Sequence, residues 1–139
     1  MHRSRRNIRT LVVDDSPVAL GSIRLLLKNR RSLEIVGYAE DGEEGVAQAR
    51  DLQPDLILMD LQMPRLDGMG AIRLIRGFMD DVRIIVITFI HGEEVQKECR
   101  EIGADGFVVK DRLYQDLIAE IQRVFTGHSS DLNGPVRIQ

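Results

Sequence analysis

The chain has 139 residues and a formal net charge of −3, with 43% hydrophobic and 29% charged residues. This length suffices for one domain with a sizeable core, and the acidic balance argues against a nucleic-acid-binding domain, which is normally basic. The single cysteine excludes an internal disulfide, and no apolar stretch approaches the roughly 18 residues of a membrane span, so we expect a cytoplasmic protein without membrane contact.

Short apolar runs alternate with helical patterns along most of the chain. Strands are predicted over residues 9–13, 33–39, 56–60, 83–89 and 105–109, and helices over 18–29, 43–52, 68–78, 93–102 and 113–125. Ser16-Pro17 is typical of a helix start, with Ser as the N-cap and Pro in the first turn. This alternation predicts an α/β fold with a doubly wound five-stranded parallel sheet, right-handed crossovers and helices on both faces.

The pattern also predicts the domain boundaries. The repeated units define one domain over residues 8–126. Residues 1–7 are rich in arginine and are interpreted as a basic N-terminal arm. Residues 127–139 contain Gly, Ser, Asn and Pro without helical or strand periodicity, which is typical of a flexible tail or linker.

The most informative stretch is residues 54–68, which read P-D-L-I-L-M-D-L-Q-M-P-R-L-D-G. Its apolar run over 56–59 lacks polar alternation and therefore indicates a strand buried on both faces. The run ends at Asp60, on the rim where open α/β sheets place their ligands. Taken alone, Asp60 would more simply be a solvated carboxylate at a strand end.

Polar residues at the other strand ends change that interpretation. Asp14 and Asp15 follow the first strand, Thr88 ends the fourth and Lys110 follows the fifth. If the first strand lies between the second and third, these ends converge. Three carboxylates repel one another and need a cation, and an all-oxygen ligand set suits Mg²⁺. One aspartate could instead accept a phosphoryl group, whose oxygens a metal, an ammonium and a hydroxyl would stabilise.

Four motifs resemble the receiver domain of two-component response regulators. They are V-V-D-D-S-P at 12–17, L-M-D-L-Q-M-P-R-L-D-G at 58–68, I-V-I-T at 85–88 and G-A-D-G-F-V-V-K at 103–110. The resemblance covers roughly residues 8–125 and implies the flavodoxin-like strand order 2-1-3-4-5. It further implies a phosphoryl donor, either a sensor histidine kinase or a phosphotransfer protein.

The resemblance assigns roles residue by residue. The Mg²⁺ site would comprise Asp14, Asp15, Asp60 and the backbone carbonyl of Gln62, with Asp15 favoured as the direct ligand among the acidic pair. Asp60 would be the phosphoacceptor, Thr88 would hydrogen-bond the phosphoryl group, Lys110 would pair with it, and Phe107 would be the aromatic switch.

The resemblance also implies how the domain would switch. Phosphorylation adds nearly two negative charges. Thr88 and Lys110 would be drawn toward them, and Phe107 would turn into the vacated space. The result is a population shift between two packings that controls an output. The domain would thus be a switch with self-catalysed phosphotransfer and autodephosphorylation, not a metabolic enzyme.

Two positions depart from the family pattern. Phe89 follows Thr88 where a small residue is usual, so we expect slower phosphotransfer or hydrolysis than in relatives with Ala. Asp111 replaces the frequent proline after Lys110, so that a cis bond there would be costly. The pair Lys110-Asp111 resembles the sequence at this position in the subfamily whose receivers precede a helix-turn-helix domain. In such a protein DNA would be bound only by that C-terminal domain, which would regulate transcription.

Alternatives remain at this stage. A haloacid-dehalogenase-like phosphatase also uses Asp, Thr and Lys at strand ends, but its first strand ends in Asp-x-Asp, whereas Asp14 and Asp15 are adjacent. A nucleotide-binding fold would need a glycine-rich loop, which the first turn lacks. A docking pseudo-receiver is disfavoured by the complete polar set.

The remaining candidates have simpler interpretations. His2, His91 and His128 lack metal-ligand spacing, although His91 is expected near the pocket rim, and Cys99 is expected in the core. The helix over 113–125 is apolar on more than one side, so its excess could form a homodimer or partner surface.

Overall fold

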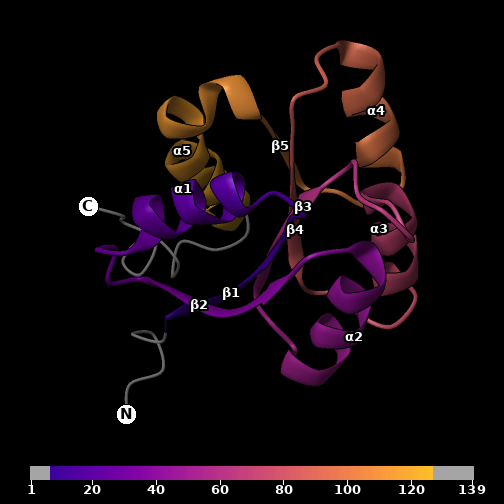
Figure 1. Ribbon diagram of the computed structural model, residues 1–139, viewed down its shortest axis with the longest axis horizontal. Helices are drawn as coiled ribbons and strands as arrows, with labels where there is room; N and C mark the ends of the chain where they lie inside the picture. The colour runs from indigo at the N-terminus through magenta and orange to yellow at the C-terminus, as the bar shows by residue number, and fades with distance from the viewer. Residues whose placement is uncertain (1–6, 127–139) are drawn as a thin grey trace.

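The computed structural model describes residues 7–126 (Figure 1). The predicted tail and nearly all of the predicted basic arm lie outside the described residues. In chain order the elements are β1 (Ile8–Val13), α1 (Pro17–Leu27), β2 (Leu33–Ala39), α2 (Gly42–Leu52), β3 (Leu56–Asp60), α3 (Gly68–Arg76), β4 (Arg83–Thr88), α4 (Glu93–Glu101), β5 (Gly106–Val109), the 3₁₀ turn η2 (Lys110–Arg112) and α5 (Leu113–Thr126).

The five strands form one parallel sheet in the order β2-β1-β3-β4-β5, which confirms the predicted fold class and strand order. Every residue of the central strand β3 is buried, as its uninterrupted apolar run predicts. The less uniformly apolar β2 lies at an edge. Helices α1 and α5 cover one face, and α2, α3 and α4 cover the other (Figure 1).

Each face of the sheet has its own apolar core. On one face Val12, Leu58 and Ile85 pack with Ile23 of α1 and Leu117 of α5. On the other, residues of the same strands pack with α2, α3 and α4 through Ala49, Ile72 and Cys99. Neighbouring residues of a strand point to opposite faces of the sheet, so each strand contributes alternate residues to the two cores.

Side-chain caps start three of the helices at the carboxyl edge of the sheet. Ser16 accepts a hydrogen bond from the Ala19 N–H at 3.2 Å. Asp41 and Asp67 cap α2 and α3 in the same way, each at the third residue on. By contrast α4 begins after Gly92, which has φ 126° and no side-chain cap.

The boundaries differ from the prediction mainly where polar residues end an element. Helix α3 stops at Arg76 before Gly77, two residues earlier than predicted, and β4 stops at Thr88 because Phe89 turns out of the sheet. The 3₁₀ turn at Lys110 was not predicted, and there is no cis peptide bond anywhere in residues 7–126, so Lys110-Asp111 is trans. No helix in this described part is long and apolar enough to span a bilayer.

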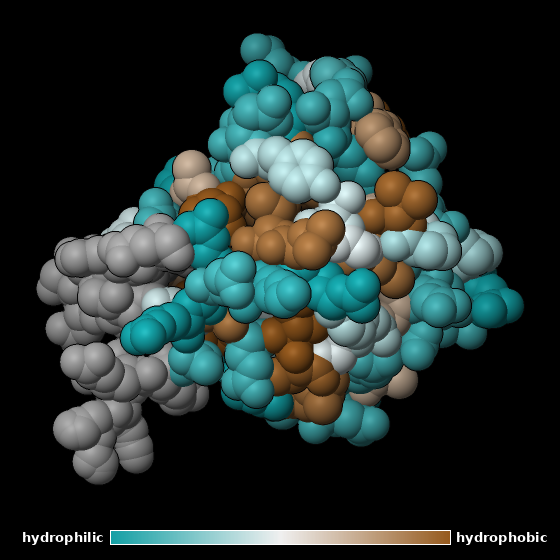
Figure 2. All heavy atoms as spheres, turned by 60° about the vertical axis from the view of Figure 1, so that its left-hand side comes forward, coloured by the Kyte–Doolittle hydropathy of each residue, from teal (hydrophilic) through white to brown (hydrophobic). Residues whose placement is uncertain are grey.

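The exposed surface carries few large apolar side chains. On α1 these are Val18 and Leu25, and on α5 Tyr114 is 61% exposed while five of its apolar neighbours are buried. Figure 2 shows patches of hydrophobic side chains separated by hydrophilic ones on the side that lies at the left in Figure 1. Most of the apolar side chains of the last helix are thus buried in the core, and Tyr114 is the large one that is exposed.

Candidate functional site

The polar residues singled out in the sequence meet at the carboxyl edge of the sheet. Val13 is paired with Met59, Asp60 with Ile87 and Thr88 with Val109 across adjacent strands. Asp14, Asp60, Thr88 and Lys110 therefore leave four neighbouring strands at nearly the same level.

Three carboxylates form the centre of this site. Asp14, Asp15 and Asp60 each offer an oxygen, and these oxygens all lie within 4.8 Å of one another. Asp14 and Asp60 are 1% and 5% exposed, whereas Asp15 is exposed. The Oδ1 atom of Asp14 accepts the Ser16 N–H at 2.9 Å, but its buried Oδ2 has no hydrogen-bond partner. Three clustered carboxylates, one with a buried oxygen that accepts no hydrogen bond, fit a hard divalent cation such as Mg²⁺.

Lys110 supplies the counter-charge. Its side chain is only 8% exposed, and its Nζ lies 2.7 Å from Asp14 Oδ2 and 3.5 Å from Asp60 Oδ1. The short contact to Asp14 is an ion pair. One ammonium therefore faces three carboxylates, and the site keeps a net negative charge.

The pKa of Asp60 reflects this imbalance. Burial is the main cause, and the charge of Asp14 adds to it, while Lys110 and a backbone hydrogen bond from Gln62 act in the opposite direction; together they raise the pKa of Asp60 to about 6. A carboxylate that resists ionisation in this way gains from any cation brought beside it.

The strand β4 end carries the hydroxyl of the site. Thr88 is fully buried, and its Oγ1 accepts the Ile90 N–H at 3.2 Å. The next residue, Phe89, is 61% exposed, with its ring centroid 5.4 Å from Lys110 Nζ. His91 pairs with Asp111 at 2.9 Å, a contact that no local sequence pattern could have indicated because the two residues are 20 positions apart.

Phe107 lies farther from the carboxylates, on the edge strand β5. Its ring is half-buried against the core on the α4 side, and its N–H donates to Glu120 Oε2 at 2.9 Å. Beside it is a cavity of about 250 Å³, lined also by Cys99, Arg100 and Arg123. Phe107 therefore borders both the core on the α4 side and this cavity.

A glycine brings the helix α3 close to Asp60. The N–H of Gly68 donates to Leu61 O at 3.0 Å, and a Cβ at Gly68 would stand 2.1 Å from the carbonyl oxygen of Asp60. Only glycine permits this approach. The P-R-L-D-G segment after Asp60 therefore folds back tightly under the strand end.

The family model for the response regulator receiver domain matches residues 10–122. The chain is a receiver domain of the two-component response regulator family. The receiver is 38% identical over 105 residues to protein-glutamate methylesterase/protein-glutamine glutaminase 3 of Geobacter sulfurreducens, covering 76% of this chain and 28% of that protein. It is 32% identical over 120 residues to the response regulator GacA of Pseudomonas aeruginosa, covering 86% and 56%.

A solved structure agrees with this assignment. The crystal structure of a LuxR-family two-component response regulator from Aurantimonas sp. SI85-9A1 matches with a TM-score of 0.82 and 29% identity, covering 94% of the receiver and 96% of that chain. The receiver spans about half or less of the length of the curated relatives named above. None of these matches supports the phosphatase alternative, and the candidate nucleophile of the receiver is on β3 instead of β1.

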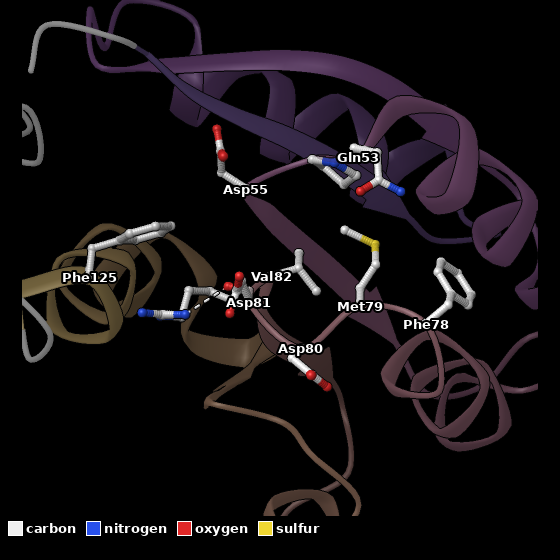
Figure 3. A pocket seen from close by; sticks show the side chains of 10 residues that line it. Gln53, Asp55, Phe78, Met79, Asp80, Asp81, Val82 and Phe125 are labelled. Carbon is white, nitrogen blue, oxygen red and sulfur yellow. Dashed lines mark hydrogen bonds between the residues drawn. The ribbon is translucent and has the colours of Figure 1, made fainter. Parts of the chain in front are cut away.

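A second cavity lies at the opposite end of the strands. It has a volume of about 430 Å³, with Phe78 and Met79 on one side and Phe125 on the other (Figure 3). The carboxylates of Asp80 and Asp81 also line it. Because it opens at the amino ends of β3 and β4, it has no part in the chemistry at Asp60.

Proposed function

We propose that Asp60 is the phosphoacceptor of this receiver and that it takes the phosphoryl group from a phosphohistidine of a sensor histidine kinase or phosphotransfer protein. The observation that carries the proposal is the buried Asp60 carboxylate, with an ammonium at 3.5 Å and two further carboxylates around it. Receiver domains as a family bind Mg²⁺ in such an acidic pocket.

The transfer is a direct displacement at phosphorus. An Oδ of Asp60 forms the new O–P bond while the P–N bond to the donor histidine breaks, and the donor leaves as neutral imidazole after taking up one proton. Lys110 would move from Asp14 toward the phosphoryl oxygens, and the Thr88 hydroxyl would donate a hydrogen bond to one of them. Mg²⁺, held by Asp14, Asp15, Asp60 and the Gln62 carbonyl, would neutralise charge on the phosphoryl oxygens.

Hydrolysis of the phosphorylated Asp60, which ends the cycle, would use the same residues. A water attacks phosphorus, the O–P bond to Asp60 breaks, and inorganic phosphate and the free carboxylate result. The receiver supplies catalysis for both of its own steps. In this proposal the receiver works as a switch and not as a metabolic enzyme.

Switching would couple this chemistry to the outer surface. When Thr88 turns toward the phosphoryl group, its Oγ1 gives up the Ile90 N–H, and the loop before α4 shifts. Phe107 would then turn into the space that Thr88 vacates. The altered face of α4, β5 and α5 would control the output.

The output itself depends on segments beyond the receiver. The matched segment makes up 28% of the methylesterase relative and 56% of the response regulator GacA. The similarity to a LuxR-family two-component response regulator supports a transcriptional output. In this proposal, DNA is bound by a separate C-terminal domain and the receiver forms a homodimer.

The test is incubation with acetyl phosphate and Mg²⁺, followed by intact mass measurement of wild type, Asp60→Asn and Asp15→Asn. We expect one phosphate adduct on wild type, none on Asp60→Asn, and a slowed reaction on Asp15→Asn that more Mg²⁺ partly restores. An adduct on Asp60→Asn would move the acceptor elsewhere. No adduct on any variant would favour the docking pseudo-receiver.

A further inference from the structure

Two loops at the carboxyl edge of the sheet are joined by an ion pair that lies outside the phosphoacceptor constellation. His91 Nε2, in the loop between β4 and α4, is 2.9 Å from Asp111 Oδ2 in the turn η2. The side chains are 62% and 54% exposed, so the pair lies at the surface. Within residues 7–126, no other ion pair links these two segments.

The same two loops touch again nearer to Asp60. The Phe89 ring centroid lies 5.4 Å from Lys110 Nζ, in the geometry of a cation–π contact. Lys110 is 8% exposed although Phe89 is 61% exposed. The ring thus stands on the solvent side of the ammonium, which in turn lies beside Asp14 and Asp60.

The loop that carries Phe89 is held on its inner side, where Ile90 packs against the core. The preceding Thr88 is fixed in the sheet and binds the Ile90 N–H, but Gly92 follows with φ 126° and opens α4 without a side-chain cap. A loop ending in an uncapped glycine has little to fix it from the helix side. The contact that His91, two residues after Phe89, makes with Asp111 can therefore influence the position of the Phe89 ring.

We propose that His91 is a positioning residue for phosphotransfer: by pairing with Asp111 it holds Phe89 over Lys110 and narrows the approach to the Asp60 carboxylate. This rests on the proposed function. With the pair formed, small phosphoryl donors reach Asp60 slowly, and water reaches the acyl phosphate slowly. The phosphoryl group is consequently long-lived.

The pair is strongest when His91 carries a charge. Histidine is the side chain type that gains its charge as the pH falls within the physiological range, so a lower pH favours the charged pair. Its charged neighbours along the two segments are Glu93 and Glu94 in the first turn of α4, and Lys110 and Arg112 in η2 with Asp111. A neutral ring would keep only a hydrogen bond to Asp111, so the restriction is expected to weaken as the charge is lost.

The experiment compares phosphorylation by acetyl phosphate with Mg²⁺ at pH 6.0 and 8.0, followed by intact mass. Both His91→Ala and Asp111→Asn are expected to react about two- to fivefold faster than wild type at pH 6.0, the range that an exposed pair allows, and by a smaller factor at pH 8.0. His91→Lys, whose charge persists, should match wild type at pH 6.0 and stay slow relative to the other variants at pH 8.0.

Two controls separate this role from a general charge effect. Glu94→Gln removes a charge in the first turn of α4, close to His91 in the chain. It should leave the phosphorylation rate unchanged at both pH 6.0 and pH 8.0. Phe89→Ala alone is expected to be phosphorylated faster than wild type. Adding His91→Ala to Phe89→Ala should not raise the phosphorylation rate further, because His91 acts through the Phe89 ring.

Three outcomes would overturn the inference: equal rates for wild type and His91→Ala at pH 6.0, an undiminished effect of His91→Ala in the Phe89→Ala background, or failure of His91→Lys to retain the slow rate. A wild type that gains no phosphate adduct at either pH would refute the proposed function itself, and the inference with it. These results are distinguishable because the first three all require that wild type is phosphorylated.

Discussion

Replacing Asp60 by asparagine is expected to stabilise the protein in the absence of divalent cations. The pKa of Asp60 is raised to about 6 from 3.8, mainly by burial and next by the charge of Asp14. Because one pKa unit corresponds to about 1.4 kcal/mol, ionised Asp60 costs the folded state about 3 kcal/mol relative to its neutral form. Asparagine keeps the shape of the side chain and removes the charge.

The sign of the pH dependence follows from proton binding. Between pH 3.8 and 6 the unfolded chain has lost the Asp60 proton while the folded protein retains it, so the free energy of unfolding falls as the pH rises through this window. The free energy of unfolding of Asp60→Asn should not show this decrease, because asparagine does not ionise. The advantage of Asp60→Asn over wild type should therefore be small near pH 4 and approach about 3 kcal/mol at pH 8.

The assay is urea unfolding of both proteins from pH 4 to 8 in EDTA, repeated with Mg²⁺. Mg²⁺ should shrink the difference at pH 8 because it binds the wild-type carboxylates and stabilises the folded state by mass action. Asp15→Asn serves as the matched control, and its effect should be much smaller because Asp15 is exposed. An advantage of Asp60→Asn that is absent at pH 8, or that does not vary with pH, would refute the reasoning.

Other variants test the frame around the site. Lys110→Met leaves Asp14 and Asp60 without their buried counter-charge and should cost about 3–5 kcal/mol at pH 8 in EDTA, with partial recovery in Mg²⁺; an unchanged urea midpoint would contradict the pairing. Gly68→Ala, whose Cβ would meet the Asp60 carbonyl oxygen at 2.1 Å, should lose about 1–3 kcal/mol and slow phosphorylation. Gly21→Ala, which meets nothing within 4 Å, should instead gain about 0.5–1 kcal/mol in the same urea titration. Arg76→Met removes the hydrogen bonds to Gly103 O and Asp105 and should lower stability by about 2 kcal/mol; a loss below 0.5 kcal/mol would show that water replaces them.

Local patterns were enough to predict the elements and most of the site. The apolar run before Asp60 is a buried strand because its residues pack on both faces, and Ser16-Pro17 starts a helix because Ser satisfies a free N–H and Pro suits the first turn. Element ends were less exact. The 3₁₀ turn at Lys110 depends on how β5 meets α5, which no local signal encodes.

The loop contacts were outside the reach of sequence reasoning. Nothing near His91 indicates Asp111, and nothing near Phe107 indicates Glu120, because each pair is joined only when distant segments pack together. The same holds for the cavity beside Phe107, whose walls come from three elements.

What the amino-acid sequence determined by itself is which chemical groups stand at the strand ends, since periodicity and turn residues set where each strand stops. Only the tertiary structure decided how those groups meet: that the Lys110 ammonium lies closer to Asp14 than to Asp60, that Asp60 is buried enough to resist ionisation, and that an exposed ring covers the ammonium. The physical reason is that charge and burial act through distances of a few ångströms between residues far apart in the chain, and packing alone sets those distances.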